Sequence, residues 1–347
     1  MKNKVYLIGE IGQNHNGSTD IAKKMVDVIS EPVTDKLFNK QLRGWDAVKL
    51  TKRDLTEELS ASMMNKPYDS PHSFGETYGE HRAFLELSEE EHHEVYDHAK
   101  SRGLDFIETI CAIGALGVLK HFTPDRLKVA SRDLTNIPLL EALAETKLPI
   151  ILSTGMGGKR EIDNALDTIT SYHSDISILH CVSEYPTRYE NVNLNTIRYL
   201  MKNYRDYVIG YSDHTIGIAI PLAAAALGVS IIEKHITLDR NMKGSDHRGS
   251  LGIDGIKRMV RDIRNLEDAM GSEELFISPA VKDIRVKLER SLATRKDLGA
   301  GHVIKDEDLH LLSPGDGFSW LDRSKVIGKK LINDLPADEI IYPENIE

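Results

Sequence analysis

The chain has 347 residues, of which 40% are hydrophobic and 28% are charged, a composition typical of a globular protein with one large core and room for a small second domain. Its formal net charge of -10 makes nucleic acids and anionic membrane surfaces unfavourable partners, so an anionic ligand would have to be held by local cations. Its two cysteines, Cys111 and Cys181, have no metal-ligand spacing, which argues against a disulfide scaffold or a thiolate metal site and favours a cytoplasmic location.

Eight short, β-branched runs alternate with helical patterns from residue 4 onward. The first is interrupted by Gly and Glu, so it predicts a strand and not a signal peptide, and no run approaches the roughly 18 apolar residues of a membrane span. The predicted strands are residues 4–12, 46–52, 105–110, 126–133, 149–156, 176–183, 207–214 and 229–237. Amphipathic helical patterns between near-continuous apolar strands favour a parallel sheet covered on both faces.

Eight such units within about 270 residues predict an α/β fold in which the sheet closes into a (β/α)8 TIM barrel. An open, doubly wound sheet is the alternative, but no GxGxxG follows the first strand.

Two segments depart from the alternation. Residues 53–87 are long for a loop and contain Tyr, Phe, His and Arg, which indicates a functional lid or a connector that packs. Beyond residue 270 the composition becomes turn-rich, and we predict a TIM-barrel catalytic domain at 1–270, a linker at 271–289 and a small, mostly β domain at 290–347. A domain of about 58 residues is marginal in stability, so we expect it to dock against a barrel, its own or a partner's.

Chemistry in this barrel fold sits at the carboxyl ends of the strands, and every predicted strand ends in polar or ionisable residues. In strand order they are Glu10, Asn14 and His15; Lys49; Glu108 and Thr109; Lys128, Ser131 and Asp133; Ser153 and Thr154; Ser183 and Tyr185; Ser212, Asp213 and His214; Lys234 and His235. Any one of them alone would more often be a hydrogen-bonded or solvated residue. Convergence of all eight sets predicts an active site.

His214 and His235 end the last two strands, which lie about 4.8 Å apart in a barrel. Two neutral imidazoles on one divalent cation leave positions open for water and a substrate oxygen, which suits a Lewis-acid site better than a structural zinc site. The alternative is that both histidines fill polar layers of the barrel.

Lys49 and Lys128 supply positive charge in an acidic protein, with serine hydroxyls beside them, a combination that suits a phosphate or carboxylate anion. One of these lysines could instead pair with Glu10 or Glu108 as a core ion pair. No GxxxxGK[ST] run is present, so nucleotide binding by a P-loop is not supported.

A series of motifs runs along the whole chain: EIGQNHNGS (10–18), AVKL (47–50), YGEHR (78–82), LKVAS (127–131), PIILSTGM (149–156), IGYSDHT (209–215), IEKHIT (232–237) and GSDHRGSL (244–251). In order and spacing they resemble the sialic acid (N-acetylneuraminate) synthase family of nonulosonate synthases. Residues 290–309 resemble that family's C-terminal antifreeze-like (SAF) domain.

The resemblance implies an enzyme, a transferase that condenses phosphoenolpyruvate with an open-chain, N-acetylmannosamine-like aldose to give a nine-carbon 3-deoxy-2-ulosonic acid and phosphate. It also implies a divalent metal, Mn or Mg, and a homodimer with swapped C-terminal domains. By position, His214 and His235 would bind the metal; Lys49, Thr109, Lys128, Ser131, Ser153, Ser183 and Ser212 would bind phosphoenolpyruvate; Glu10, Tyr185 and Asp246 would face the sugar; and Glu10, Asp133, His214 and His235 would be catalytic.

Several positions depart from the family's pattern. The usual Glu two positions after Ser131 is Asp133, which we expect to act as the base for water addition, with a shorter reach. Thr51 stands where many members have Gln, and Ser183 where Asn is frequent. The small domain's usual Arg-Pro-Gly run, whose Arg addresses the N-acetyl group, begins here with Ser313. These departures predict a different acceptor, such as mannose, a 6-deoxy sugar or a diacetamido sugar.

Two other functions fit the residues at the strand ends. A metal-dependent aldolase or isomerase for sugar phosphates would react without phosphoenolpyruvate and release no phosphate. The second alternative function is that of a non-catalytic barrel in polysaccharide assembly. The set of Lys, Ser and His residues argues against it, because burying charged groups costs free energy and a barrel without catalysis would have no need for them.

Overall fold

The computed structural model describes residues 4–347. The chain forms two compact units, the first ending at Gly271 and the second running from Ser272 to Glu347. None of the helices in the described part of the chain has the length and apolarity needed to cross a bilayer.

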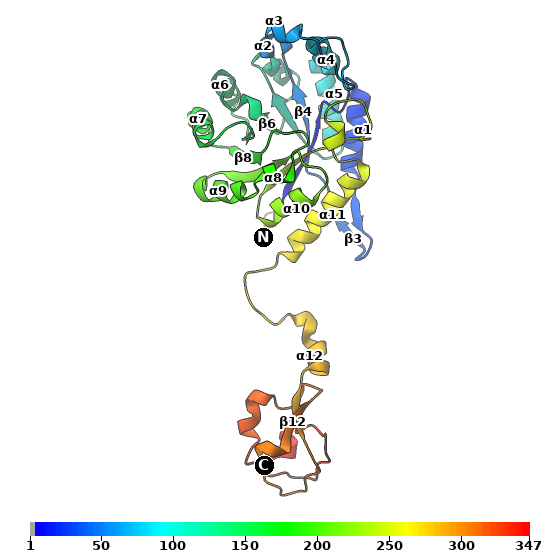
Figure 1. The fold of residues 1–347 in the computed structure, drawn as a ribbon, viewed down its shortest axis with the longest axis vertical. Helices are drawn as coiled ribbons and strands as arrows, with labels where there is room; N and C mark the ends of the chain where they lie inside the picture. Colours follow the sequence, from blue (N-terminus) through cyan, green and yellow to red (C-terminus); the bar gives the residue numbers. More distant parts are fainter. Residues whose placement is uncertain (1–3) are drawn as a thin grey trace. The chain divides into compact units, whose positions relative to one another are not determined.

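The first unit is a closed barrel of eight parallel strands, which confirms the predicted fold (Figure 1). Around the barrel the strands follow the order β1-β10-β9-β8-β7-β6-β5-β4, so β1 closes the ring by pairing with both β10 and β4. Their bounds are β1 (Tyr6–Gly12), β4 (Ala47–Lys52), β5 (Asp105–Ile110), β6 (Arg126–Val129), β7 (Ile150–Ser153), β8 (Ile176–Cys181), β9 (Val208–Asp213) and β10 (Ile231–His235).

The longer helices, among them α1, α5, α6, α7, α9 and α11, surround the barrel (Figure 1). The helices of this unit are α1 (Thr19–Ser30), α2 (Leu55–Glu58), α3 (Ala61–Met64), α4 (Tyr78–Leu85), α5 (Glu89–Ser101), α6 (Ile137–Glu145), α7 (Lys159–Thr170), α8 (Tyr189–Val192), α9 (Asn195–Asn203), α10 (Ala219–Ala226) and α11 (Ile253–Ala269). Ser88 and Glu91 form a capping box at the start of α5: Ser88 Oγ accepts from the Glu91 amide, and Glu91 Oε2 accepts from the Ser88 amide.

The barrel interior is filled at one level by a small apolar cluster, separate from the larger core between strands and helices. Its buried members are Ile8, Ala47, Ile107, Ile151, Leu179 and Ile231. Side chains on a strand return to the same face every two residues. The residues two positions further along these six strands are Glu10, Lys49, Thr109, Ser153, Cys181 and Glu233, so the apolar layer forms a floor beneath a polar layer.

The long segment at 53–87 packs, as its composition indicates. It contains α2, α3 and α4 together with an aromatic cluster, in which Phe74 stacks on Phe84 with ring centroids 4.6 Å apart and Tyr68 meets Tyr78 edge to face at 5.4 Å. Between α1 and β4 a short hairpin forms from β2 (Val33–Asp35) and β3 (Lys40–Leu42).

The second unit has a two-stranded antiparallel sheet, β11 (Ser291–Thr294) with β12 (Leu309–Leu312). Its own small core includes Leu292, Ile304 and Ile341. A short helix, α12 (Lys282–Leu288), lies in the predicted linker, and its Val286 carbonyl accepts a 2.8 Å hydrogen bond from the Gly315 amide.

Candidate active site

A cavity of about 400 Å³ lies above the apolar floor, where the strands end. Strand pairing places its residues side by side. Glu10 is in register with Lys49 on one side and His235 on the other, and Thr109 is in register with Lys128. Closure of the barrel therefore brings residues that are far apart in sequence together on one polar surface.

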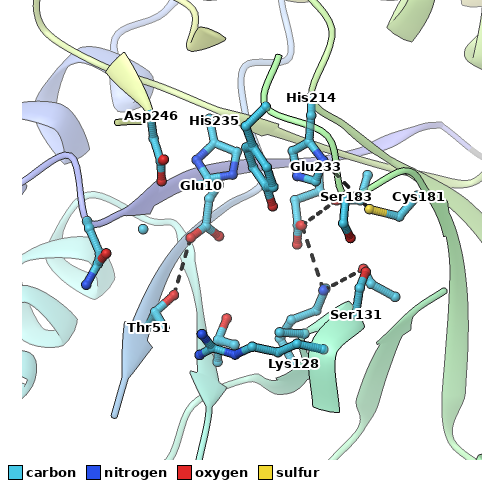
Figure 2. Close-up of a pocket in the computed structure, with 18 of the residues that line it drawn as sticks. Glu10, Thr51, Lys128, Ser131, Cys181, Ser183, His214, Glu233, His235 and Asp246 are labelled. Carbon is cyan, nitrogen blue, oxygen red and sulfur yellow. Dashed lines mark hydrogen bonds and ion pairs between the residues drawn. The ribbon is translucent and has the colours of Figure 1, made fainter. Parts of the chain in front are cut away.

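Nearly all residues predicted for the site line this cavity. They are Glu10, Lys49, Thr109, Lys128, Ser131, Ser153, Ser183, Tyr185, Ser212, His214, His235 and Asp246, and Thr51 joins them. Figure 2 shows the two imidazoles and Asp246 along one side, with Lys128 and Ser131 on the other.

Asp133 is the exception among the predicted site residues. It lies in a single-turn helix after β6, Ser131–Asp133, and it lines a separate cavity of about 210 Å³ with Glu57, Glu58 and Cys111. Arg132 lines the main cavity, and its Nε donates to Asp133 Oδ2 at 3.3 Å. The turn therefore directs Ser131 and Arg132 to the main cavity and Asp133 away from it.

Other strand-end candidates have structural partners. Glu108 contacts His92 at 2.9 Å within the buried interior. Asn14 donates to the Ile236 carbonyl at 2.8 Å and to Ser250 Oγ at 2.9 Å. Thr154 Oγ1 donates to the Leu179 carbonyl at 3.1 Å. The first two bind neighbouring segments of the barrel unit together and, like Thr154, do not line the main cavity.

His214 and His235 face each other with ring centroids 5.5 Å apart, and Tyr185 covers His214 at 4.0 Å. His214 Nδ1 lies 2.8 Å from the Val182 carbonyl, which favours a proton on Nδ1 and leaves Nε2 as a lone-pair donor. His235 is buried, which lowers its pKa to about 3 and keeps it neutral, and its Nδ1 has no hydrogen-bond partner among the described residues.

This pair fits a divalent cation, because the metal-binding form of histidine is the neutral imidazole, which burial favours at His235. At His214, burial lowers the pKa but the contact with Cys181 outweighs it and raises the pKa, so this imidazole would release a proton on binding the metal. Within residues 4–347 no group of three or more His, Cys, Asp or Glu side chains is arranged to hold a metal. The chain would therefore contribute two nitrogen ligands, and oxygen atoms of water or substrate would complete the coordination, as in an open catalytic site.

Asp213 belongs to a buried cluster behind the histidines. It forms an ion pair with Lys234, and both side chains are fully buried. It also accepts a 2.8 Å hydrogen bond from Tyr211 and a 3.1 Å bond from Thr215. Because Lys234 additionally donates to the Thr215 carbonyl, this cluster ties the end of β9 to β10 next to both imidazoles.

The two lysines have different partners. Lys49 forms an ion pair with Glu10, lies 3.7 Å from Glu233 and donates to Thr109 Oγ1 at 2.8 Å. Lys128 donates to Ser153 Oγ at 2.6 Å and stays 3.8 Å from Glu233. Lys49 therefore forms the core ion pair that the sequence offered as an alternative. Lys128 has only a longer contact with a carboxylate, so its charge is less fully neutralised.

Burial and the two lysines shift the pKa values of the neighbouring carboxylates, Glu10 and Glu233. Burial raises the pKa of Glu10 to about 7, with Lys49 opposing the shift. Burial would also raise the pKa of Glu233, but Lys128 and Lys49 outweigh it and lower that pKa to about 2. Glu233 therefore stays ionised, while Glu10 can exchange a proton near neutral pH.

Sequence reasoning missed several residues that line the cavity. Glu233, Arg53, Arg82 and Arg132 all line the cavity. Glu233 could have been found from its place two residues before His235, on the same strand face. Arg82 falls in the YGEHR motif, but only the fold shows that α4 carries it to the barrel mouth.

The cavity is rich in positive charge although the chain carries a net charge of -10. Its cations are Lys49, Lys128, Arg53, Arg82 and Arg132, and its carboxylates are Glu10, Glu233 and Asp246. Hydroxyl groups from Ser131, Ser153 and Ser212 lie among them. Such a surface can hold a small molecule with more than one negative charge.

Known protein families match most of the chain. The model of the NeuB family matches residues 40–275, and that of the SAF domain matches residues 289–347. The chain is 35% identical to the N,N'-diacetyllegionaminic acid synthase of Legionella pneumophila, over 99% of this chain and 94% of that protein. It is 33% identical to the human N-acetylneuraminate-9-phosphate synthase, over 99% and 92%.

A solved structure supports the same family assignment. The crystal structure of the N-acetylneuraminic acid synthetase from Leptospira borgpetersenii superposes with a TM-score of 0.68 at 30% identity, covering 82% of this chain and 90% of that chain. The resemblance seen in the motifs is thereby confirmed, and the chain belongs to the NeuB family, with a SAF domain at its C-terminus.

Proposed function

We propose that the protein condenses phosphoenolpyruvate with an open-chain, six-carbon aldose related to N-acetylmannosamine, giving a nine-carbon 3-deoxy-2-ulosonic acid and phosphate. The observation that carries this proposal is the single cavity in which a cation-rich surface adjoins a pair of imidazoles. One part suits a phosphorylated carboxylate, and the other suits an aldehyde oxygen. Membership of the NeuB family supports the same reaction.

The reaction forms one carbon-carbon bond and replaces the C2–O bond to phosphate with a C2–O bond from water. C3 of phosphoenolpyruvate attacks the aldehyde carbon of the sugar, whose oxygen takes up a proton and becomes a hydroxyl. Water adds at C2, losing one proton. The C2–O bond to phosphate then breaks with the electron pair leaving on phosphate, and the new C2 hydroxyl gives up its proton to phosphate and becomes the ketone. Phosphoenolpyruvate, aldose and water thus give ulosonic acid and phosphate, with no oxidant or reductant.

Lys128 is the central residue of the proposed phosphoenolpyruvate site. Its ammonium is buried, shares a hydrogen bond with Ser153 and keeps Glu233 at 3.8 Å. Because an incoming anion can take up charge-assisted bonds from Lys128 and nearby hydroxyls, it is held without breaking a tight ion pair. Ser131, Ser183 and Ser212 complete the hydroxyl set on the same wall.

His214 and His235 are proposed to hold Mn or Mg. A divalent cation bound there would supply Lewis acidity at the aldehyde oxygen. The chain's own contribution is to keep His235 neutral by burial and to orient His214 through the Val182 carbonyl at its Nδ1.

Glu10 is better placed than Asp133 to move protons at the reacting carbons. It lines the main cavity, and burial raises its pKa to about 7, which is suited to a general acid or base near neutral pH. Asp133 lines the neighbouring cavity and holds Arg132. We therefore propose that Asp133 acts by positioning Arg132, in place of the base role predicted from its motif.

Tyr185 and Asp246 border the proposed sugar side of the cavity, beside the histidines. Ser313, in the second unit, donates through Oγ to the Leu288 carbonyl at 3.2 Å, and a serine cannot supply the cationic contact that the family's Arg would make. This supports an acceptor other than N-acetylmannosamine.

We also propose a cytoplasmic homodimer. Both cysteines are free thiols, in keeping with a reducing compartment. Residues 275–277 and α12 expose apolar side chains, among them Leu275, Phe276 and Leu288, which favours burial against a second copy. Light scattering on the full chain would show twice the monomer mass, whereas a monomer at micromolar concentration would contradict the proposal.

The decisive assay follows phosphoenolpyruvate-dependent product formation with Mn present, across N-acetylmannosamine, mannose and diacetamido hexoses. His214→Ala should abolish the turnover of the accepted sugar, and a variant of the exposed Lys159, Lys159→Met, should retain it. Sugar cleavage or isomerisation without phosphoenolpyruvate would favour the aldolase or isomerase function. Turnover that survives His214→Ala would contradict the proposed metal site.

A further inference from the structure

A fully buried lysine lies between the two strands that carry the histidine pair. Lys234 comes directly before His235 on β10, and it is in register with Asp213 on β9, which comes directly before His214. Side chains alternate between the two faces of a strand. Lys234 therefore lies on the face opposite to Glu233 and His235, which line the main cavity. It can influence the reaction only through other residues.

The ammonium of Lys234 binds the turn that presents His214. It forms an ion pair with Asp213 and donates a hydrogen bond to the Thr215 carbonyl. The Asp213 carboxylate accepts from the Thr215 amide at 3.1 Å and from the Thr215 hydroxyl at 3.1 Å. A bond from an aspartate side chain to the amide two residues ahead closes a tight turn, and His214 is the residue inside it. Lys234 thus holds both neighbours of His214.

The two imidazoles are held in different ways. The backbone carbonyl of His214 accepts a 2.9 Å hydrogen bond from the Thr187 amide, and its ring Nδ1 lies 2.8 Å from the Val182 carbonyl. His235 Nδ1 has no hydrogen-bond partner among residues 4–347, so its strand has to position this ring. The separation of the imidazoles therefore depends on how the ends of β9 and β10 are joined, which is the contact that Lys234 makes.

Stability alone does not account for this buried ion pair. Two apolar side chains of similar volume are often as stable as a buried pair of charges, or more so. The Asp213 carboxylate also accepts from Tyr211 at 2.8 Å, so together with its bonds from Thr215 and Lys234 its acceptor positions are filled. What the charged pair adds over apolar side chains is a set of directed bonds to the turn.

We propose that Lys234 is a positioning residue for the metal site. Acting through Asp213 and Thr215, it sets the separation and orientation of the two imidazoles and thereby the affinity for a divalent cation. The proposal rests on the proposed function, in which His214 and His235 hold that cation. Two nitrogen ligands bind a metal tightly only when both are fixed before it arrives, because ordering them on binding costs entropy.

The test is calorimetric titration of the full-length, substrate-free protein with Mn. The double variant Asp213→Leu with Lys234→Met replaces the charges by apolar side chains, which should preserve most of the stability. It removes the acceptor that closes the turn and the donor to the Thr215 carbonyl. We expect this variant to bind Mn roughly 10- to 100-fold more weakly than the wild type, the range found when groups that orient metal ligands are replaced.

Arg264→Met is the matched control. Arg264 is also a buried cation that ties backbone segments together, but it acts at the amino ends of the strands. It lies 3.3 Å from Asp46 and donates to the Val5 carbonyl at 2.8 Å. Arg264→Met should lower the free energy of unfolding and leave the Mn affinity unchanged. Wild-type Mn affinity in the double variant, or an equal loss of affinity in Arg264→Met, would overturn the proposal.

NMR of the metal-free protein, with histidine labelled by ¹⁵N, tests the positioning without metal or substrate. The Nδ1 proton of His214, held by the Val182 carbonyl, should give a signal that the double variant loses and Arg264→Met keeps. If the wild type binds no Mn, the proposed metal site fails, and this signal still decides whether Lys234 positions His214. If the Mn affinities differ as expected but no acceptor is turned over, the proposed function fails and this inference stands. An unchanged signal in the double variant would exclude the inference.

Discussion

Replacing Lys49 and replacing Lys128 with Met should have different consequences, the first mainly for the stability of the fold and the second mainly for substrate binding. Lys49 is tied to Glu10 by an ion pair, and both side chains are almost fully buried. Lys49→Met would leave Glu10 buried without its counter-charge, and removing one partner of a buried pair costs about 3–5 kcal/mol of unfolding free energy.

Lys128 has no such tight carboxylate partner among residues 4–347. Its pKa is lowered by burial, which Glu233 only partly opposes, so replacing it with Met relieves a desolvation penalty. Glu233 would keep Lys49 at 3.7 Å and the 2.8 Å hydrogen bond from Ser212. We expect Lys128→Met to lower the free energy of unfolding less than Lys49→Met, because Glu233 keeps a second cation, Lys49, whereas Glu10 would lose its direct ion-pair partner.

The main effect of the Lys128→Met substitution should instead be on the binding of phosphoenolpyruvate. A hydrogen bond to a charged group contributes about 1.5–3 kcal/mol, so Lys128→Met should raise KM for phosphoenolpyruvate roughly 10- to 150-fold at saturating acceptor. Urea unfolding without substrates measures the stability, and steady-state kinetics measures KM. Lys159→Met, on the exposed surface of α7, serves as the control. Equal destabilisation by both substitutions, or an unchanged KM in Lys128→Met, would refute the assigned roles.

Three aspartates give further predictions. If Asp133 acts through Arg132, Asp133→Asn should lower kcat less than about tenfold, whereas loss of a direct general base would lower it 100-fold or more. Asp213→Asn should lower the free energy of unfolding by about 3–5 kcal/mol, because Lys234 keeps an uncompensated buried charge. The double variant Asp213→Leu with Lys234→Met should regain most of this free energy. If urea unfolding shows no such gain in the double variant, the loss has a different cause. In the second unit, His302 and Lys296 outweigh burial and lower the pKa of Asp308 to about 2. A carboxyl whose pKa is lower in the folded state stabilises it above its unfolded pKa of about 4 and loses this contribution as pH falls toward 2. Thermal unfolding between pH 5 and 2 should therefore be less pH-dependent in Asp308→Asn than in the wild type, and identical slopes would contradict the ion pairing.

The sequence by itself determined the barrel and most of its site. Eight apolar runs separated by amphipathic helices can bury their faces only as a covered parallel sheet, and the residues that end those runs are carried to one mouth by the fold's geometry. That is why Lys128, His214 and His235 could be assigned from strand ends alone, and each lines the cavity.

Tertiary structure decided the pairings within the cavity. Barrel closure sets β1 between β4 and β10, and only this register brings Glu10 beside Lys49. The short turn after β6 sends Asp133 into another cavity, although its distance from Ser131 in sequence suggested otherwise. Such contacts depend on strand register and turn geometry, which residue spacing does not encode.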